Sequence, residues 1–218
     1  MSMYAFRKYE EMPPEEAVFS LLGVTSDDLQ ATALQCFRMA ASAGPLQPKG
    51  AKGTLAWIYG TEHIRSQLIP KGWRPEDVNN QPRVVSPDGR HAITVICGDP
   101  NTGNPHREPL TRNKRGTQTS RSVHYNAAQT DMFPVEQRQR QAFTPDDMQE
   151  KTLWILLFHV DIENRVVFFE LSRPINMGDN GKVDGWMPRF IMSPLYLDRL
   201  GDDPFESGPD LDVPVIPR

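Results

Sequence analysis

The chain has 218 residues, of which 38% are hydrophobic and 24% charged, and its net charge is −4. This length supports one sizeable domain, and the negative charge excludes a generally basic protein that coats nucleic acid. Two cysteines are too few for a disulfide framework, and no apolar run approaches membrane-spanning length. We therefore expect a cytoplasmic protein without membrane contact.

Residues 1–46 are expected to form an N-terminal helical segment with two helices. The first begins with two prolines and two glutamates (13–16), residue types favoured in a first helical turn, and it ends at Gly23. Thr25 or Ser26 then caps the second helix, whose apolar residues recur at helical spacing.

Residues 54–200 predict an α+β domain with a mostly antiparallel sheet built from two hairpins. Residues 83–97 flank a Pro-Asp-Gly turn, and residues 153–172 carry the longest apolar runs. Because the second strand of the later hairpin begins with four apolar residues (166–169), we expect both of its faces to be covered.

The remaining elements of this domain are predicted less directly. Residues 47–53 indicate a flexible connector, and the apolar run 54–59 fits either a strand or the start of a helix. Helices are expected at 62–69 and 117–129. The last predicted strand of the domain covers residues 185–192 and is interrupted by Pro188.

Two polar stretches lie outside this pattern. Residues 134–150 lack periodicity and predict a linker or a mobile loop. Residues 201–218 are acidic and rich in proline, so we expect a tail with little structure of its own.

A basic segment interrupts this acidic chain at residues 105–125. It contains five cations against one carboxylate, Glu108, which gives +4 and leaves −8 for the rest of the chain. Its middle combines cations, glycine and a helix start, and such a start offers unpaired N–H groups to anions. We predict that it binds a phosphate-bearing ligand; the alternative is a solvated loop that neutralises the acidic tail. The candidate residues are Arg112, Lys114, Arg115, Thr117, Thr119 and Arg121.

A second candidate directly follows the basic segment. Residues 129–133 read Gln-Thr-Asp-Met-Phe, which resembles the peptide by which many bacterial DNA-processing proteins dock on the sliding clamp. Gln129, Met132 and Phe133 fit that pattern, whereas Thr130 departs from its usual leucine. The resemblance implies a protein partner; the alternative is that Met132 and Phe133 end a helix and belong to the core.

A third candidate is the set of carboxylates on the later hairpin. Asp161, Glu163 and Glu170 resemble the metal-binding carboxylates of restriction-type nucleases, which implies a divalent-metal site. Those enzymes place a lysine two residues after the glutamate, where this chain has Ser172. Arg173 is one position late and faces the other side of a strand. The alternative is that Glu170 is a structural ion paired with Arg165 or Arg189.

No motif indicates a cofactor or a bound metal. We therefore expect a non-enzymatic binding or accessory protein that contacts nucleic acid through its basic loop and the following helix start. The alternatives are a protein-interaction factor of a phage or mobile element, and a divergent metal-dependent nuclease.

Overall fold

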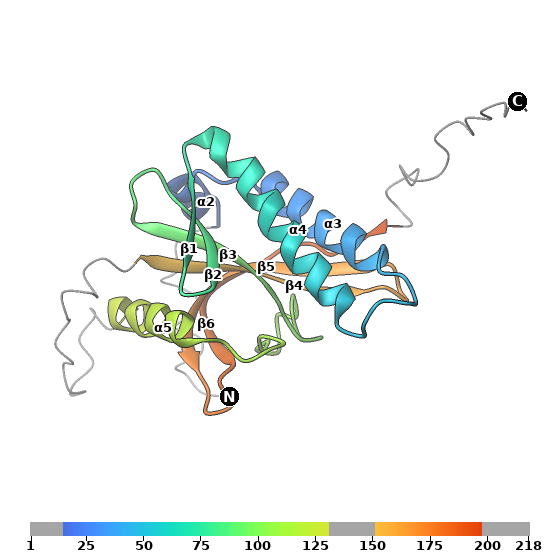
Figure 1. Ribbon diagram of the computed structural model, residues 1–218. Coiled ribbons are helices and arrows are strands. Elements are labelled where there is room, and N and C mark those ends of the chain that lie inside the picture. Colours follow the sequence, from blue (N-terminus) through green and yellow to red (C-terminus); the bar gives the residue numbers. More distant parts are fainter. Residues whose placement is uncertain (1–14, 131–150, 198–218) are drawn as a thin grey trace, which may run out of the picture.

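The computed structural model describes residues 15–130 and 151–197. Four helices and a seven-stranded sheet make up this part of the chain (Figure 1). In chain order they are α2 (Glu15–Leu22), α3 (Ser26–Ala41), α4 (Ala51–Leu68), β1 (Arg74–Val78), β2 (Gln81–Val85), β3 (His91–Cys97), α5 (Thr117–Thr130), β4 (Thr152–Asp161), β5 (Val166–Met177), β6 (Val183–Ile191) and β7 (Leu195–Tyr196). A 3₁₀ turn (Ile69–Lys71) follows α4.

The sheet confirms the predicted α+β class. Its strand order is β1-β2-β3-β4-β5-β6, with β7 paired to β5. Every described pairing is antiparallel except that between β3 and β4. A parallel pair needs a long crossover connection, and the connection here includes α5.

The two N-terminal helices begin and end where the sequence indicates. The Thr25 side chain accepts the Asp28 amide at 3.2 Å, and the Asp28 carboxylate accepts the Thr25 amide at 2.7 Å. This capping box satisfies two N–H groups that a helix start would otherwise leave unpaired. Gly23, which follows α2, has a φ of +67°, a conformation that glycine adopts without strain.

α4 is longer than expected. It begins at Ala51, inside the expected connector 47–53, and continues through the apolar run 54–59 to Leu68, so it includes all of the predicted helix 62–69 except Ile69. The apolar run is therefore helical, because its inward side packs on α3 and β3 rather than pairing in the sheet. Short apolar runs do not by themselves distinguish the two structures.

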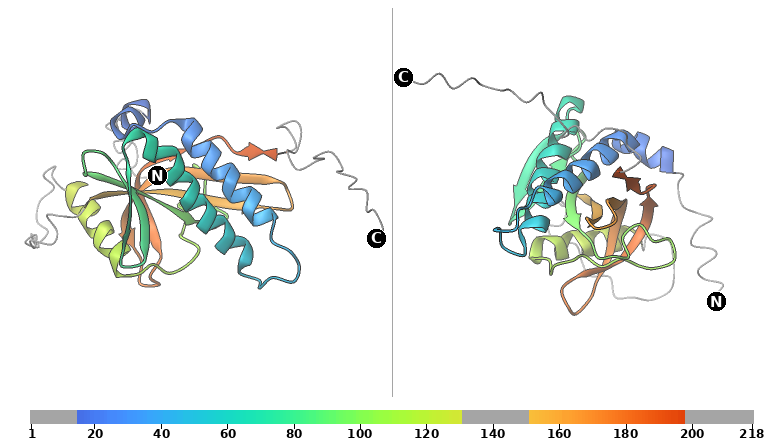
Figure 2. Two further views of the ribbon diagram at one scale, coloured as in Figure 1. Left: turned by 45° about the horizontal axis from the view of Figure 1, so that its top comes forward. Right: turned by 90° about the vertical axis from the view of Figure 1, so that its right-hand side faces the viewer.

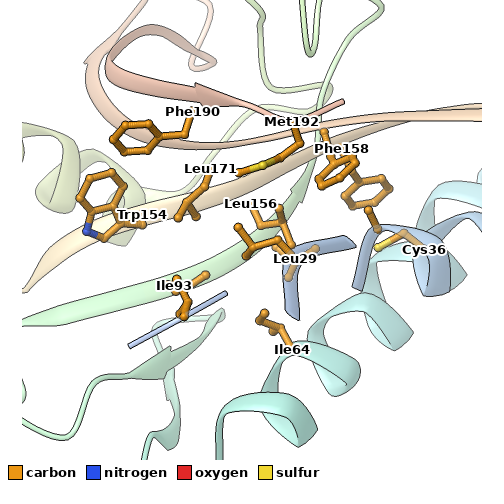
Figure 3. Close-up of a cluster of buried hydrophobic side chains, with 14 of the residues drawn as sticks. Leu29, Cys36, Ile64, Ile93, Trp154, Leu156, Phe158, Leu171, Phe190 and Met192 are labelled. Atoms are coloured by element: carbon orange, nitrogen blue, oxygen red, sulfur yellow. The ribbon is translucent and has the colours of Figure 1, made fainter. Parts of the chain in front are cut away.

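The sheet is covered on both faces, as expected for β5. On β4, Trp154, Leu156 and Phe158 pack with α2, α3 and α4, whereas Leu153, Ile155 and Leu157 face α5. Figure 2 shows α3 and α4 on one side of the sheet and α5 on the other, and Figure 3 shows the larger of the two cores. α2 and α3 thus share one core with the sheet of the predicted domain 54–200.

Three strands differ from the prediction. Neither β1 nor the two-residue β7 was expected, and in β1 the sequence Arg-Pro-Glu-Asp-Val is neither apolar nor alternating. β6 continues through Pro188 instead of breaking there. In the described sheet β6 pairs with β5 alone, and the register between them shifts near Pro174, so no ladder bond at Pro188 is required.

No helix in the described ranges is long and apolar enough to cross a membrane. The predicted linker at 134–150 and the predicted tail at 201–218 lie outside the described residues. The predicted division of the chain at residues 46–54 remains a prediction.

Candidate functional site

A cavity of about 610 Å³ lies where β2 separates from β3. The register between these strands joins only Val84 with Ile93 and Val85 with Ala92. Beyond that point, the end of β3 lines the cavity rather than pairing with β2.

Two helix N-termini meet at this cavity. α4 contributes Gly50, Gly53 and Thr54 from its start, and α5 contributes Gly116 and Thr119 from its own. The first N–H groups of a helix have no partner within the helix, and the helix dipole makes this end positive. α4 and α5 lie on opposite faces of the sheet (Figure 2), so the cavity receives a helix start from each side.

Three cations of the basic segment line the same cavity. Arg112 and Lys114 are exposed, and Arg115 is half-buried. None of the three forms an ion pair with a carboxylate of the described residues, and the cavity lining contains no Asp or Glu in that part of the chain. Burial lowers the pKa of Arg115, so an anion that replaced the lost water would stabilise its charge.

The Cys97 thiol, at the end of β3, lies beside two of these guanidinium groups. Its pKa is raised by burial, while a hydrogen bond from Arg112 and the charges of Arg112 and Arg115 act in the opposite direction. Arg112 also reaches the first turn of α4, because a Cβ placed on Gly53 would lie 3.8 Å from its Nη1. The Arg112 guanidinium therefore lies between the end of β3 and the start of α4.

Amide side chains form another part of the lining. Gln81 donates through Nε2 to the Thr119 hydroxyl at 3.1 Å, and Asn79 donates through Nδ2 to Gln118 Oε1 at 3.1 Å. These two bonds join the turn between β1 and β2 to the first turn of α5. Gln81 is only 6% exposed, yet its Oε1 has no hydrogen-bond partner among the described residues.

The predicted anion-binding residues are brought together only in part. Arg112, Lys114, Arg115 and Thr119 line the cavity. Thr117 is exposed at the start of α5, and Arg121 lies one turn further along that helix; neither contributes to the lining.

The predicted docking peptide is only partly described. Gln129 is half-buried, and its Oε1 accepts a hydrogen bond from the Thr152 hydroxyl at 3.0 Å. Its side chain thus contacts β4 of its own chain. Met132 and Phe133 lie outside the described residues.

The hairpin carboxylates are separated. Glu170 is fully buried, and Arg189 binds it at 2.6 Å and 3.1 Å. Asp161 lies at the turn between β4 and β5, where it accepts two hydrogen bonds from Asn164, and Glu163 is exposed in that turn. In the described ranges no group of three His, Cys, Asp or Glu side chains could hold a metal ion.

Sequence reasoning missed several lining residues. Trp57, Asn79 and Gln81 come from segments without a charge pattern. The turn between β1 and β2 did carry a local signal, the dipeptide Asn79-Asn80, because asparagine tolerates the positive φ that a two-residue hairpin turn requires. In the structure these residues have φ values of +47° and +62°. Nothing local links Trp57 to residues 112–119, which only the fold brings near.

Comparison with known protein families, with characterised proteins and with solved structures gives no significant match.

Proposed function

We propose that this protein acts by binding a phosphate-bearing ligand, and that the ligand is nucleic acid. The observation that carries the proposal is the meeting of three cations and two helix N-termini at one cavity. The cations have no carboxylate partner in the described part of the chain, so a phosphate would not have to displace one.

Helix starts and guanidinium groups act on phosphate in complementary ways. N–H groups at a helix start donate along fixed directions, and glycine at Gly53 and Gly116 leaves room for close approach. Arg112 and Arg115 can each donate two parallel hydrogen bonds to phosphate oxygens, whereas Lys114 adds a mobile charge. Cations of this kind usually supply most of the affinity of a protein for nucleic acid.

The proposal is tested by replacing Arg112, Lys114 and Arg115 with alanine. Fluorescence anisotropy with labelled single-stranded and duplex DNA and RNA, measured over a range of salt concentrations, should show weaker binding. The slope of log K against log salt should fall by about 0.7 for each phosphate of a single strand that the variant no longer neutralises.

A matched variant carries the same number of substitutions away from the cavity, at Arg74, Arg90 and Arg107, all of which are exposed. Its affinity and salt slope should stay close to those of the natural protein. Equal losses of affinity in both variants, or no binding of any nucleic acid by the natural protein, would contradict the proposal.

A further inference from the structure

The cavity lining offers more than phosphate contacts. Gly50, Gly53, Thr54 and Trp57 recur at the i, i+3 and i+4 spacing that places side chains on one face of α4. Trp57 is half-buried, whereas Trp73, Trp154 and Trp186 are at most 5% exposed. Trp57 is thus the one tryptophan of the four that a ligand in the cavity can reach.

Gln81 adds an independent indication of a ligand. It is more than nine-tenths buried and lines the cavity, and its Oε1 has no partner among the described residues. A buried acceptor without a partner has lost its hydrogen bonds to water, so such groups usually meet a ligand or an ordered water molecule. A half-turn about the last side-chain bond exchanges the two amide atoms, so one of them is unpaired in either orientation.

The size of the cavity limits the ligand. About 610 Å³ is within the range of sites that enclose a small molecule. A base inside a duplex is stacked between its neighbours and cannot lie against a tryptophan, whereas an unpaired base can. The cations and helix starts would take its phosphate, which leaves Trp57 and Gln81 for the base.

We infer that the cavity takes one unpaired nucleotide, free or within a single strand, with its phosphate at the starts of α4 and α5. The base stacks on Trp57 and directs an N–H group toward Gln81. This inference rests on the proposed function and specifies the ligand of the same site.

Tryptophan fluorescence provides the test. Nucleoside 5′-monophosphates of the four bases, an eight-nucleotide single strand and a duplex of the same sequence are each added to the full chain. We expect quenching by the single strand, by the monophosphates, or by both, and less quenching by the duplex. If the single strand binds more tightly than the monophosphates, the ligand is a polymer. If the two bind with equal affinity, the ligand is a free nucleotide. Quenching by the duplex alone would overturn the inference.

Two variants remove the base contacts and leave the cations in place. Trp57→Leu should weaken binding roughly 5- to 150-fold, the range for removal of one base–aromatic stack, and abolish the quenching. Gln81→Met keeps the length of the side chain and should weaken binding roughly 2- to 10-fold. Tyr59→Leu is the matched control, because Tyr59 is an exposed aromatic residue of the same helix outside the lining.

Failure of the inference and failure of the proposed function give different results. If Trp57→Leu and Gln81→Met bind nucleotides as the natural protein does, while alanine at Arg112, Lys114 and Arg115 weakens binding, the base site is wrong and the phosphate site stands. If inorganic phosphate, nucleotides and strands all fail to bind, both are wrong. Circular dichroism and thermal unfolding of each variant distinguish a direct effect on binding from a failure to fold.

Discussion

At the scale of single residues, the buried pair of Glu170 and Arg189 holds the loop that carries the cations. Arg189 also donates to the carbonyl oxygens of Asn104 and Arg107, at 3.1 Å and 3.0 Å, and Glu170 accepts the Gly103 amide at 3.1 Å. Three described segments, the loop 103–107, β5 and β6, are thereby joined around one fully buried carboxylate. The ion-pair partner of Glu170 is therefore Arg189, and its carboxylate makes its contacts within the fold.

Replacing Arg189 with methionine should destabilise the protein by about 3–5 kcal/mol, because Glu170 then keeps a buried charge without its cation. Urea unfolding followed by circular dichroism measures the change. Arg90→Met, at an exposed turn, should stay within about 0.5 kcal/mol. A destabilisation below about 1 kcal/mol for Arg189→Met would show that the carboxylate is not held as described.

Residue types allowed part of the site to be predicted. Arg112, Lys114 and Arg115 were found because opposite charge in an acidic chain is visible without a structure. Trp57 and Gln81 were not found, because an isolated tryptophan or glutamine has many roles, and only a specific spatial neighbour selects one.

At the scale of elements, α4 packs closely against its neighbours at Gly60. A Cβ at this position would overlap the Cys36 Sγ of α3 and would lie 3.3 Å from Val95 of β3. Glycine therefore allows α4 to cross α3 and the sheet at short range, although it is a poor helix former. This approach fixes the direction of α4, whose start lines the cavity.

Gly60→Ala should destabilise the protein by about 1–3 kcal/mol despite the higher helix propensity of alanine. Gly53→Ala is the matched control in the same helix. Its Cβ meets only Arg112 Nη1 within 4 Å, so we expect no destabilisation and a gain of up to about 1 kcal/mol. Adding Cys36→Ala to Gly60→Ala should restore part of the stability, and additive effects in this double-mutant cycle, followed by urea unfolding, would contradict the packing.

Elements with strong local signals were predicted correctly, and those decided by distant contacts were not. The Thr25 cap, the Pro-Asp-Gly hairpin and the apolar β4–β5 hairpin all carry their structure in adjacent residues. β1 is polar and pairs with β2, and α4, whose start at Ala51 has no side-chain cap, packs on α3. Tertiary contacts override weak local preference at both places.

At the scale of the whole molecule, α5 lies in the crossover between the parallel strands β3 and β4 and packs on the face opposite α3 and α4. The antiparallel class was predictable from the hairpins, but this crossover was not, because hairpin signals are local. The crossover brings the start of α5 and the basic loop to the end of β3, where β2 diverges and α4 begins. The cavity is thus a product of topology, and no single segment encodes it.

Amide chemical-shift mapping by NMR can locate the proposed phosphate between the starts of α4 and α5. A ¹⁵N-labelled chain is titrated with inorganic phosphate and then with adenosine monophosphate. We predict that the amides of Gly53, Gly116 and Thr119 shift with both ligands, that the Trp57 indole N–H shifts with the nucleotide alone, and that Gly89, at the distant β2–β3 turn, does not shift. Shifts at Gly89 with none at Gly53 and Gly116, or no shifts at all, would mean that phosphate does not bind between these helix starts.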